Sequence, residues 1–267
     1  MRSQELSTSM SKELTRTLYK ALMQTTKSLP QGSPLRLRLP LAQSQAQWMG
    51  AGKQFGFLPP RSAARELFPA ERGYPSLPPE ADAPELEPEA LRGLVRSVFR
   101  TVSASAAAAP KEVDGVDLGL HALKVLHNQL AMAKRSSAVR TDSDTGAAVL
   151  VEATSEFMGR DSSNYVFSYR LRLTNVGAVP VQVIGRSWDI RNADGSSHAS
   201  VPRGSPGIVG QTPRLLPNGD CFEYASGTSL ATPTGTVEGS LQMMSLGQGD
   251  ERPFDALVGR FECVADS

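Results

Sequence analysis

The spacing of apolar residues changes once along this chain, from a helical repeat in the first half to a strand-like repeat in the second. Between residues 165 and 174, apolar and polar side chains alternate, which is typical of a strand with one face in a core and the other in water. Before residue 136, apolar residues instead recur every three or four positions. A chain of 267 residues with two such regimes is predicted to form two domains of different class.

The first regime predicts three amphipathic helices, at 13–29, 90–102 and 116–134. None of them can bury its apolar stripe alone, so we expect a small three-helix bundle or docking of the helices on a partner. Eight of the chain's 19 prolines fall between residues 59 and 88. Because proline supplies no backbone donor, the segment from about 31 to 89 is interpreted as an extended insertion or linker within a helical module covering 1–135.

The second regime predicts an antiparallel β-sandwich over residues 147–267, preceded by a small, polar linker at 136–146. Ala193-Asp194-Gly195 is a predicted hairpin turn. In this arrangement Tyr165, Phe167, Tyr169 and Trp188 are core residues, although the three alternating aromatic rings could also form a stacking platform for bases. The predicted strands are 147–157, 165–174, 179–184, 186–191, 220–224, 234–244 and 255–263.

Composition limits the chemistry that is available. The chain has 28 Lys and Arg residues against 27 Asp and Glu, so global charge does not favour a dedicated polyanion-binding protein. Two cysteines and three scattered histidines supply neither a zinc site nor a disulfide scaffold, and they fit a reducing compartment. No apolar run is long enough to span a membrane. These features disfavour a hydrolase, a metalloenzyme and a membrane protein, and no cofactor or metal is predicted.

Charge is nevertheless uneven along the chain. The first 60 residues hold eight basic residues and two acidic ones, Glu5 and Glu13. A basic segment rich in Ser, Thr and Gln resembles an organelle-targeting segment. We therefore expect import into an organelle, either a mitochondrion or a plastid, with the cytoplasm as the alternative. Further along, Arg92, Arg96 and Arg100 repeat every four residues, which fits either contact with an acidic protein or RNA, or a solvated helix face.

Ordered sequence matches across the second half of the chain, from about Val149 to Val264, resemble the ApaG family. This resemblance implies an immunoglobulin/fibronectin-like β-sandwich, giving an α+β multidomain chain. The fold is not tied to one activity. The main matching stretches are Tyr165-Val-Phe-Ser-Tyr169, Leu173-Thr-Asn175, Ser187-Trp188, Gly207-Ile-Val-Gly210, Leu216-Pro-Asn-Gly219, Phe222-Glu-Tyr224, Thr232-Pro233 and Pro253-Phe254.

The ApaG resemblance also draws attention to a glycine-containing loop. Family members often read Gly-x-Gly-x-x-Gly there, whereas this chain has Ser205-Pro-Gly-Ile-Val-Gly210. A phosphate-binding loop of this kind needs a helix N-terminus, which a sandwich does not offer, so a structural turn is the main interpretation. The alternative is an anion or nucleotide site that uses this loop. Its candidate residues are Arg203, Gly207, Gly210 and Arg214.

The helical half resembles the LYR-motif family of small mitochondrial three-helix proteins, over about Leu14 to Ala133. The motif is carried by Leu18-Tyr19-Lys20, with lysine in place of arginine, and by Phe99-Arg100. The resemblance implies an accessory subunit or assembly adaptor that contacts acyl carrier protein, iron–sulfur biogenesis machinery or a mitochondrial multi-subunit complex. A generic helical hairpin with buried Leu18 and Tyr19 at its rim is the alternative.

Together these observations predict a non-enzymatic protein-interaction adaptor. Its predicted partner-binding residues are Leu18, Tyr19, Lys20, Phe99 and Arg100. Two alternatives from other classes stay open. One is a small-molecule or nucleotide-binding module that uses the sandwich loop, and the other is an RNA-binding, ribosome-associated organellar protein that uses the basic first 60 residues.

Overall fold

The computed structural model describes residues 2–29, 35–36, 63–69, 77, 85–108, 115–208, 211–247 and 250–265. The chain divides into two compact units. The described residues of the first, which we call the helical unit, lie in Met1–Leu39 and Pro59–Ala131. Those of the second, the β unit, lie in Met132–Ser267. This division agrees with the change of apolar spacing in the sequence.

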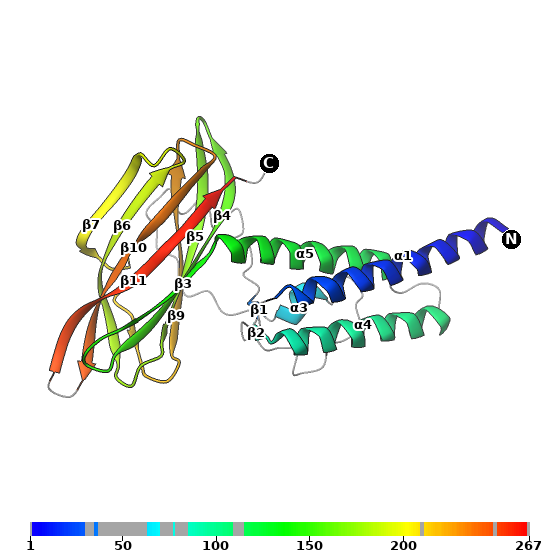
Figure 1. The fold of residues 1–267 in the computed structure, drawn as a ribbon, viewed down its shortest axis with the longest axis horizontal. Helices are drawn as coiled ribbons and strands as arrows, with labels where there is room; N and C mark the ends of the chain where they lie inside the picture. The colour runs from blue at the N-terminus through cyan, green and yellow to red at the C-terminus, as the bar shows by residue number, and fades with distance from the viewer. Residues whose placement is uncertain are drawn as a thin grey trace. The chain divides into compact units, whose positions relative to one another are not determined.

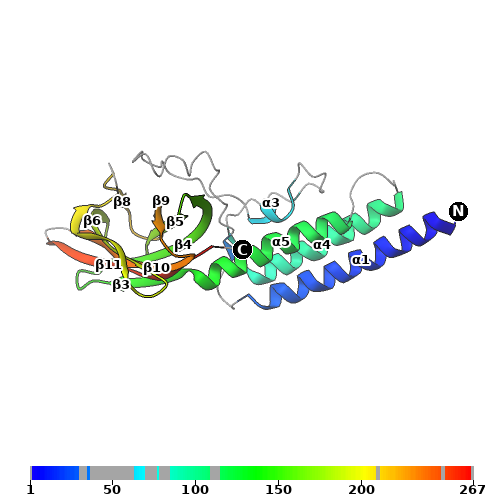
Figure 2. The ribbon, with the colours of Figure 1, turned by 90° about the horizontal axis from the view of Figure 1, so that it is seen from above.

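Three long helices pack together in the helical unit: α1 (Arg2–Lys27), α4 (Pro88–Ala108) and α5 (Gly115–Arg135). Figures 1 and 2 show them side by side. Proline suits the first turn of α4, because the N–H that it lacks would have no partner there. Gly119 of α5 allows close approach to α1, since a Cβ atom at Gly119 would lie 2.8 Å from Cβ of Leu18. The helices thereby bury the apolar stripes that the sequence shows.

The proline-rich segment contributes more to the helical unit than a linker would. Its described parts include strand β1 (Leu35–Arg36), helix α3 (Ala63–Leu67) and strand β2 (Glu85–Leu86), and β1 pairs antiparallel with β2. Leu67 and Phe68 are fully buried among residues of the three long helices. His121 Nε2 of α5 lies 3.1 Å from the carbonyl oxygen of Glu66. The interpretation of 31–89 as an extended insertion is therefore wrong for α3, whose apolar residues complete the core.

The β unit is a sandwich of two antiparallel sheets (Figure 1). One sheet has the order β3-β4-β5-β9, and the other has the order β11-β10-β6-β7, with the short β8 also paired to β6. The strands are β3 (Ser137–Asp142), β4 (Ala148–Asp161), β5 (Asn164–Asn175), β6 (Val181–Asn192), β7 (Ser197–Pro206), β8 (Arg214–Leu215), β9 (Cys221–Leu230), β10 (Thr234–Gly247) and β11 (Asp250–Val264).

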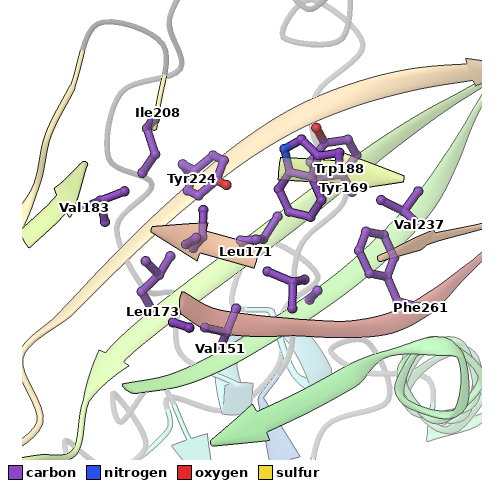
Figure 3. Close-up of a cluster of buried hydrophobic side chains, with 14 of the residues drawn as sticks. Val151, Tyr169, Leu171, Leu173, Val183, Trp188, Ile208, Tyr224, Val237 and Phe261 are labelled. Carbon is purple, nitrogen blue, oxygen red and sulfur yellow. The ribbon is translucent and has the colours of Figure 1, made fainter. Parts of the chain in front are cut away.

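The inward faces of both sheets form one core (Figure 3). Phe167, Tyr169 and Trp188 are buried in it, which confirms their assignment as core residues, while Tyr165 packs against it partly exposed. The sheets are joined along the β3 and β11 edges by side-chain hydrogen bonds. The Ser137 hydroxyl donates to the carbonyl of Gly259 at 2.7 Å, and the Leu257 N–H donates to Oγ1 of Thr141 at 2.9 Å. These bonds close the sandwich along that edge.

Two sequence predictions for the β unit are wrong. The expected linker 136–146 contains β3, which pairs with β4 along its whole length. The small polar residues that suggested a linker form an edge strand instead, where Ser137 and Thr141 hydrogen-bond to β11 of the other sheet. The two strands expected at 179–184 and 186–191 are one strand, β6, with a bulge before Gly185. The predicted turn at Ala193-Asp194-Gly195 is confirmed, since the Gly195 N–H donates to the carbonyl of Asn192 at 3.0 Å.

Candidate interaction surface

The helical unit brings the two halves of the predicted partner-binding set together. Tyr19 of α1 packs against Phe99 of α4, with ring centroids 5.5 Å apart and ring planes inclined by 51°. Leu18 and Phe99 are interior residues, with exposed fractions of 7% and 5%, and Tyr19 is half-buried beside them. Lys20 and Arg100 are exposed. Of the five predicted residues, two cations are thus fully available to a partner, and Leu18 and Phe99 hold the helices together.

Basic side chains follow this aromatic contact on both helices. Lys12 and Arg16 lie seven and three residues before Tyr19, and Arg92 and Arg96 lie at the same distances before Phe99. Residues with this spacing share one side of a helix. Lys20 and Arg100 continue the two rows, each four residues beyond the last. We call these six residues the basic seam: Lys12, Arg16 and Lys20 of α1, and Arg92, Arg96 and Arg100 of α4.

The six cations of the basic seam are at least partly open to solvent. Five of the six side chains are exposed, and Arg92 is half-exposed. No ion pair joins any of the six to a described acidic side chain. Six like charges along adjoining helices create a positive potential that attracts an acidic surface and strengthens as salt is lowered.

Sequence reasoning identified the arginine row of α4, but it missed the matching row of α1 and the meeting of the two rows. The four-residue repeat is visible in the sequence for both Lys12, Arg16, Lys20 and Arg92, Arg96, Arg100. What joins them is the packing of Tyr19 on Phe99, which are 80 positions apart. The available signal was the identical spacing of each row relative to its aromatic residue.

The candidate anion loop of the β unit is arranged differently from a phosphate-binding loop. Arg203 of β7 forms a two-point ion pair with Asp255 of β11, with N···O distances of 3.0 and 2.9 Å. A Cβ atom at Gly207 would lie 2.9 Å from Cγ1 of Val183. Glycine therefore allows the chain to pack closely on β6. Arg214 is exposed in β8, and Gly210 lies outside the described residues.

Histidine, cysteine and acidic side chains are the remaining candidates for chemistry. Among the described residues, no group of three or more His, Cys, Asp or Glu side chains is placed to hold a metal ion. Cys221 and Cys263 are both free thiols. Burial raises the pKa of the Cys263 thiol to about 11, which keeps it protonated and poorly nucleophilic near neutral pH. No described helix has the length and apolar character needed to span a bilayer.

Comparison with known proteins finds a family match for the β unit. Residues 155–245 match the family model described as the ApaG domain. Protein ApaG of Aromatoleum aromaticum is 43% identical over 115 residues, which cover 42% of this chain and 85% of that protein. Protein ApaG of Sodalis glossinidius is 47% identical over 90 residues, which cover 33% of this chain and 69% of that protein.

A crystal structure described as an ApaA protein from Bordetella pertussis is 36% identical, with a TM-score of 0.40, and the match covers 44% of this chain and 94% of that one. Residues 155–245, which match the family model, lie within the β unit, whereas the helical unit lies outside the family match. This chain therefore belongs to the ApaG family, through the β-sandwich that forms its second unit.

Proposed function

We propose that this chain is a non-enzymatic adaptor whose helical unit binds an acidic partner protein along the basic seam. The observation that carries the proposal is the pair of exposed basic rows, which meet at the Tyr19–Phe99 contact and have no described acidic neighbour in an ion pair. An acidic protein surface is complementary to such a row of cations, and complementary charge both steers and orients association.

The proposal includes the finer assignments made from the sequence. The helical unit is an LYR-like three-helix bundle, and the β unit is an immunoglobulin/fibronectin-like sandwich. The contact between Tyr19 and Phe99 supports the LYR-like part, because it joins Leu18-Tyr19-Lys20 to Phe99-Arg100. The basic first 60 residues support a mitochondrial location. Acyl carrier protein or a mitochondrial multi-subunit complex is the proposed partner of the helical unit.

Affinity recovery of the tagged full-length protein from its own cells tests this proposal. The diagnostic variant is Arg92→Glu/Arg96→Glu/Arg100→Glu, which reverses one row of the basic seam and leaves Tyr19 and Phe99 in place. Its matched control is Lys124→Glu/Lys134→Glu/Arg214→Glu, which makes the same change in net charge at exposed positions outside the seam. Co-purifying proteins and RNA are identified in parallel samples with and without nuclease treatment.

We expect wild type and the control to recover the same acidic mitochondrial protein, and the seam variant to lose it. Equal recovery by all three proteins would contradict the proposal. Recovery of RNA in place of protein, sensitive to nuclease and to the seam variant, would assign the basic seam to nucleic acid and would also overturn it.

A further inference from the structure

A bulge in β6 turns an arginine toward the interior of the sandwich. In the pairing of β6 with β10, Val183 lies opposite Met243 and Gly185 lies opposite Gln242, so Ile184 is an extra residue, and it is 42% exposed. Before the bulge the buried apolar side chains of β6 are those of Val181 and Val183, and after it they are those of Trp188 and Ile190. Side chains two apart on a strand share a face, so Arg186 is placed on the same inward face as Trp188.

The opposite sheet presents two tyrosines to this position. Tyr169 of β5 and Tyr224 of β9 lie on neighbouring strands, and both side chains belong to the sandwich core. Tyr224 lies opposite Leu171, which is also a core residue. The ring of Tyr169 lies 5.8 Å from that of Trp188. Figure 3 shows the Tyr224 hydroxyl directed toward the side on which Trp188 and Tyr169 lie. Aromatic and charged groups of both sheets thus converge near the β9 edge.

Three donor atoms in this cluster have no hydrogen-bond partner among the described residues: Arg186 Nε, Trp188 Nε1 and the Tyr224 hydroxyl. Trp188 and Tyr224 are 4% and 3% exposed. A buried donor without an acceptor is unfavourable, and native proteins contain few of them, so three in one place call for a common explanation. The Tyr169 hydroxyl, in contrast, is hydrogen-bonded to Ser226.

Electrostatics support the convergence. Burial raises the pKa of both Tyr169 and Tyr224, and the positive charge of Arg186 opposes that rise in each case. The guanidinium therefore lies close enough to both hydroxyls to act on their ionisation. One cation and three unmet donors form an environment that favours an acceptor-rich anion.

We propose that Arg186, Trp188 and Tyr224 form a binding site for a small carboxylate. A carboxylate carries one negative charge, which matches the single arginine, and its two oxygens can accept hydrogen bonds from all three donors. Phosphate carries nearly two charges near neutral pH, and one arginine would compensate them incompletely. The site lies within the β unit and is independent of the basic seam.

Indole nuclear magnetic resonance on the full-length protein tests the site. The chain has two tryptophans, so a ¹⁵N-labelled sample gives two indole N–H signals, and Trp48 is the internal reference. Sodium acetate is titrated into one sample of the protein and sodium chloride into a second, at matched ionic strength. We expect the Trp188 signal to shift and saturate at about millimolar acetate, the affinity range open to so small a ligand. An equal shift with chloride, or a shift that does not saturate, would overturn the proposal.

Two conservative variants separate binding from folding. Tyr224→Phe removes only the unpaired hydroxyl, so we expect an equal or higher Tm together with acetate affinity weakened about tenfold. Arg186→Gln removes the positive charge and should weaken the acetate affinity by at least as much. Tyr169→Phe is the matched control, and its acetate affinity should stay within about twofold, because its hydroxyl is already bonded to Ser226. Unchanged affinity in both site variants, or saturable binding of phosphate without acetate, would contradict the carboxylate site.

Discussion

The ring of Tyr19 lies against the ring of Phe99, with 5.5 Å between centroids, and this contact joins α1 to α4 across 80 positions of sequence. Phe99 is interior and Tyr19 is half-buried at the rim. This contact holds α1 and α4 together, and it thereby fixes the positions of the exposed cations of the basic seam on the two helices. Truncating either ring would disturb the helices themselves, so charge variants report more cleanly on partner binding.

Phe99→Ala is expected to destabilise the helical unit by about 3 kcal/mol, because a large buried ring is removed and the surrounding helices can relax only partly. The neighbouring exposed substitution Arg100→Ala should change the free energy of unfolding by less than about 0.5 kcal/mol. Urea unfolding followed by far-ultraviolet circular dichroism measures both. Similar stabilities for the two variants would show that Phe99 does not pack as described.

Gly207→Ala is expected to destabilise the β unit by about 1–3 kcal/mol, since the added methyl would lie 2.9 Å from Cγ1 of Val183 and 3.2 Å from the backbone nitrogen of Gly185. The same substitution tests the nucleotide-loop alternative. A variant with wild-type stability but impaired nucleotide binding would favour that alternative over a close-packed turn. Thermal unfolding and nucleotide titration of the same samples distinguish the outcomes.

Cys263 is expected to resist thiol reagents in the native protein. At pH 8 a disulfide reagent should modify the half-buried Cys221 first and reach Cys263 only after unfolding, because Cys263 is buried and its thiol is protonated. Rapid modification of two thiols in the folded protein would contradict this placement.

The raised pKa of Cys263 also has a consequence for stability at high pH. The unfolded thiol ionises near its ordinary value of 9.0, whereas the native thiol stays protonated until about 11. Above pH 9 the unfolded state therefore binds fewer protons than the native state, and the contribution of this group to the free energy of unfolding falls between pH 9 and 11. Cys263→Ala should show a shallower decline than wild type over that range when both are unfolded in urea.

Much of the architecture was predictable because it follows from local spacing. The alternation of residues 165–174 predicted β5, and the three amphipathic repeats predicted α1, α4 and α5. Strand β7 was missed because Ser197–Pro206 is a polar edge strand with two prolines and no apolar alternation. Strand β3 was missed for a related reason, because it is also a polar edge strand, in which the Ser137 hydroxyl bonds to the other sheet.

The candidate surfaces were predictable only in part. Lys20 and Arg100 followed from motif resemblance, and the arginine row of α4 from its repeat, but the meeting of the two rows depends on tertiary packing. The inward position of Arg186 was not predictable, because a single bulged residue changes which positions of β6 face the core. In a regular strand, Arg186 would share a face with Ile184, which is exposed.

Binding of an acidic partner by the basic seam is tested most directly by the salt dependence of that binding. Purified full-length protein is titrated with acyl carrier protein from the same cells at low and at physiological ionic strength, alongside the Arg92→Glu/Arg96→Glu/Arg100→Glu variant and its charge-matched control. We predict that wild type and the control bind with affinity that falls as salt rises, and that the seam variant binds at least tenfold more weakly at low salt. Affinities that are equal for the three proteins and insensitive to salt would contradict the account.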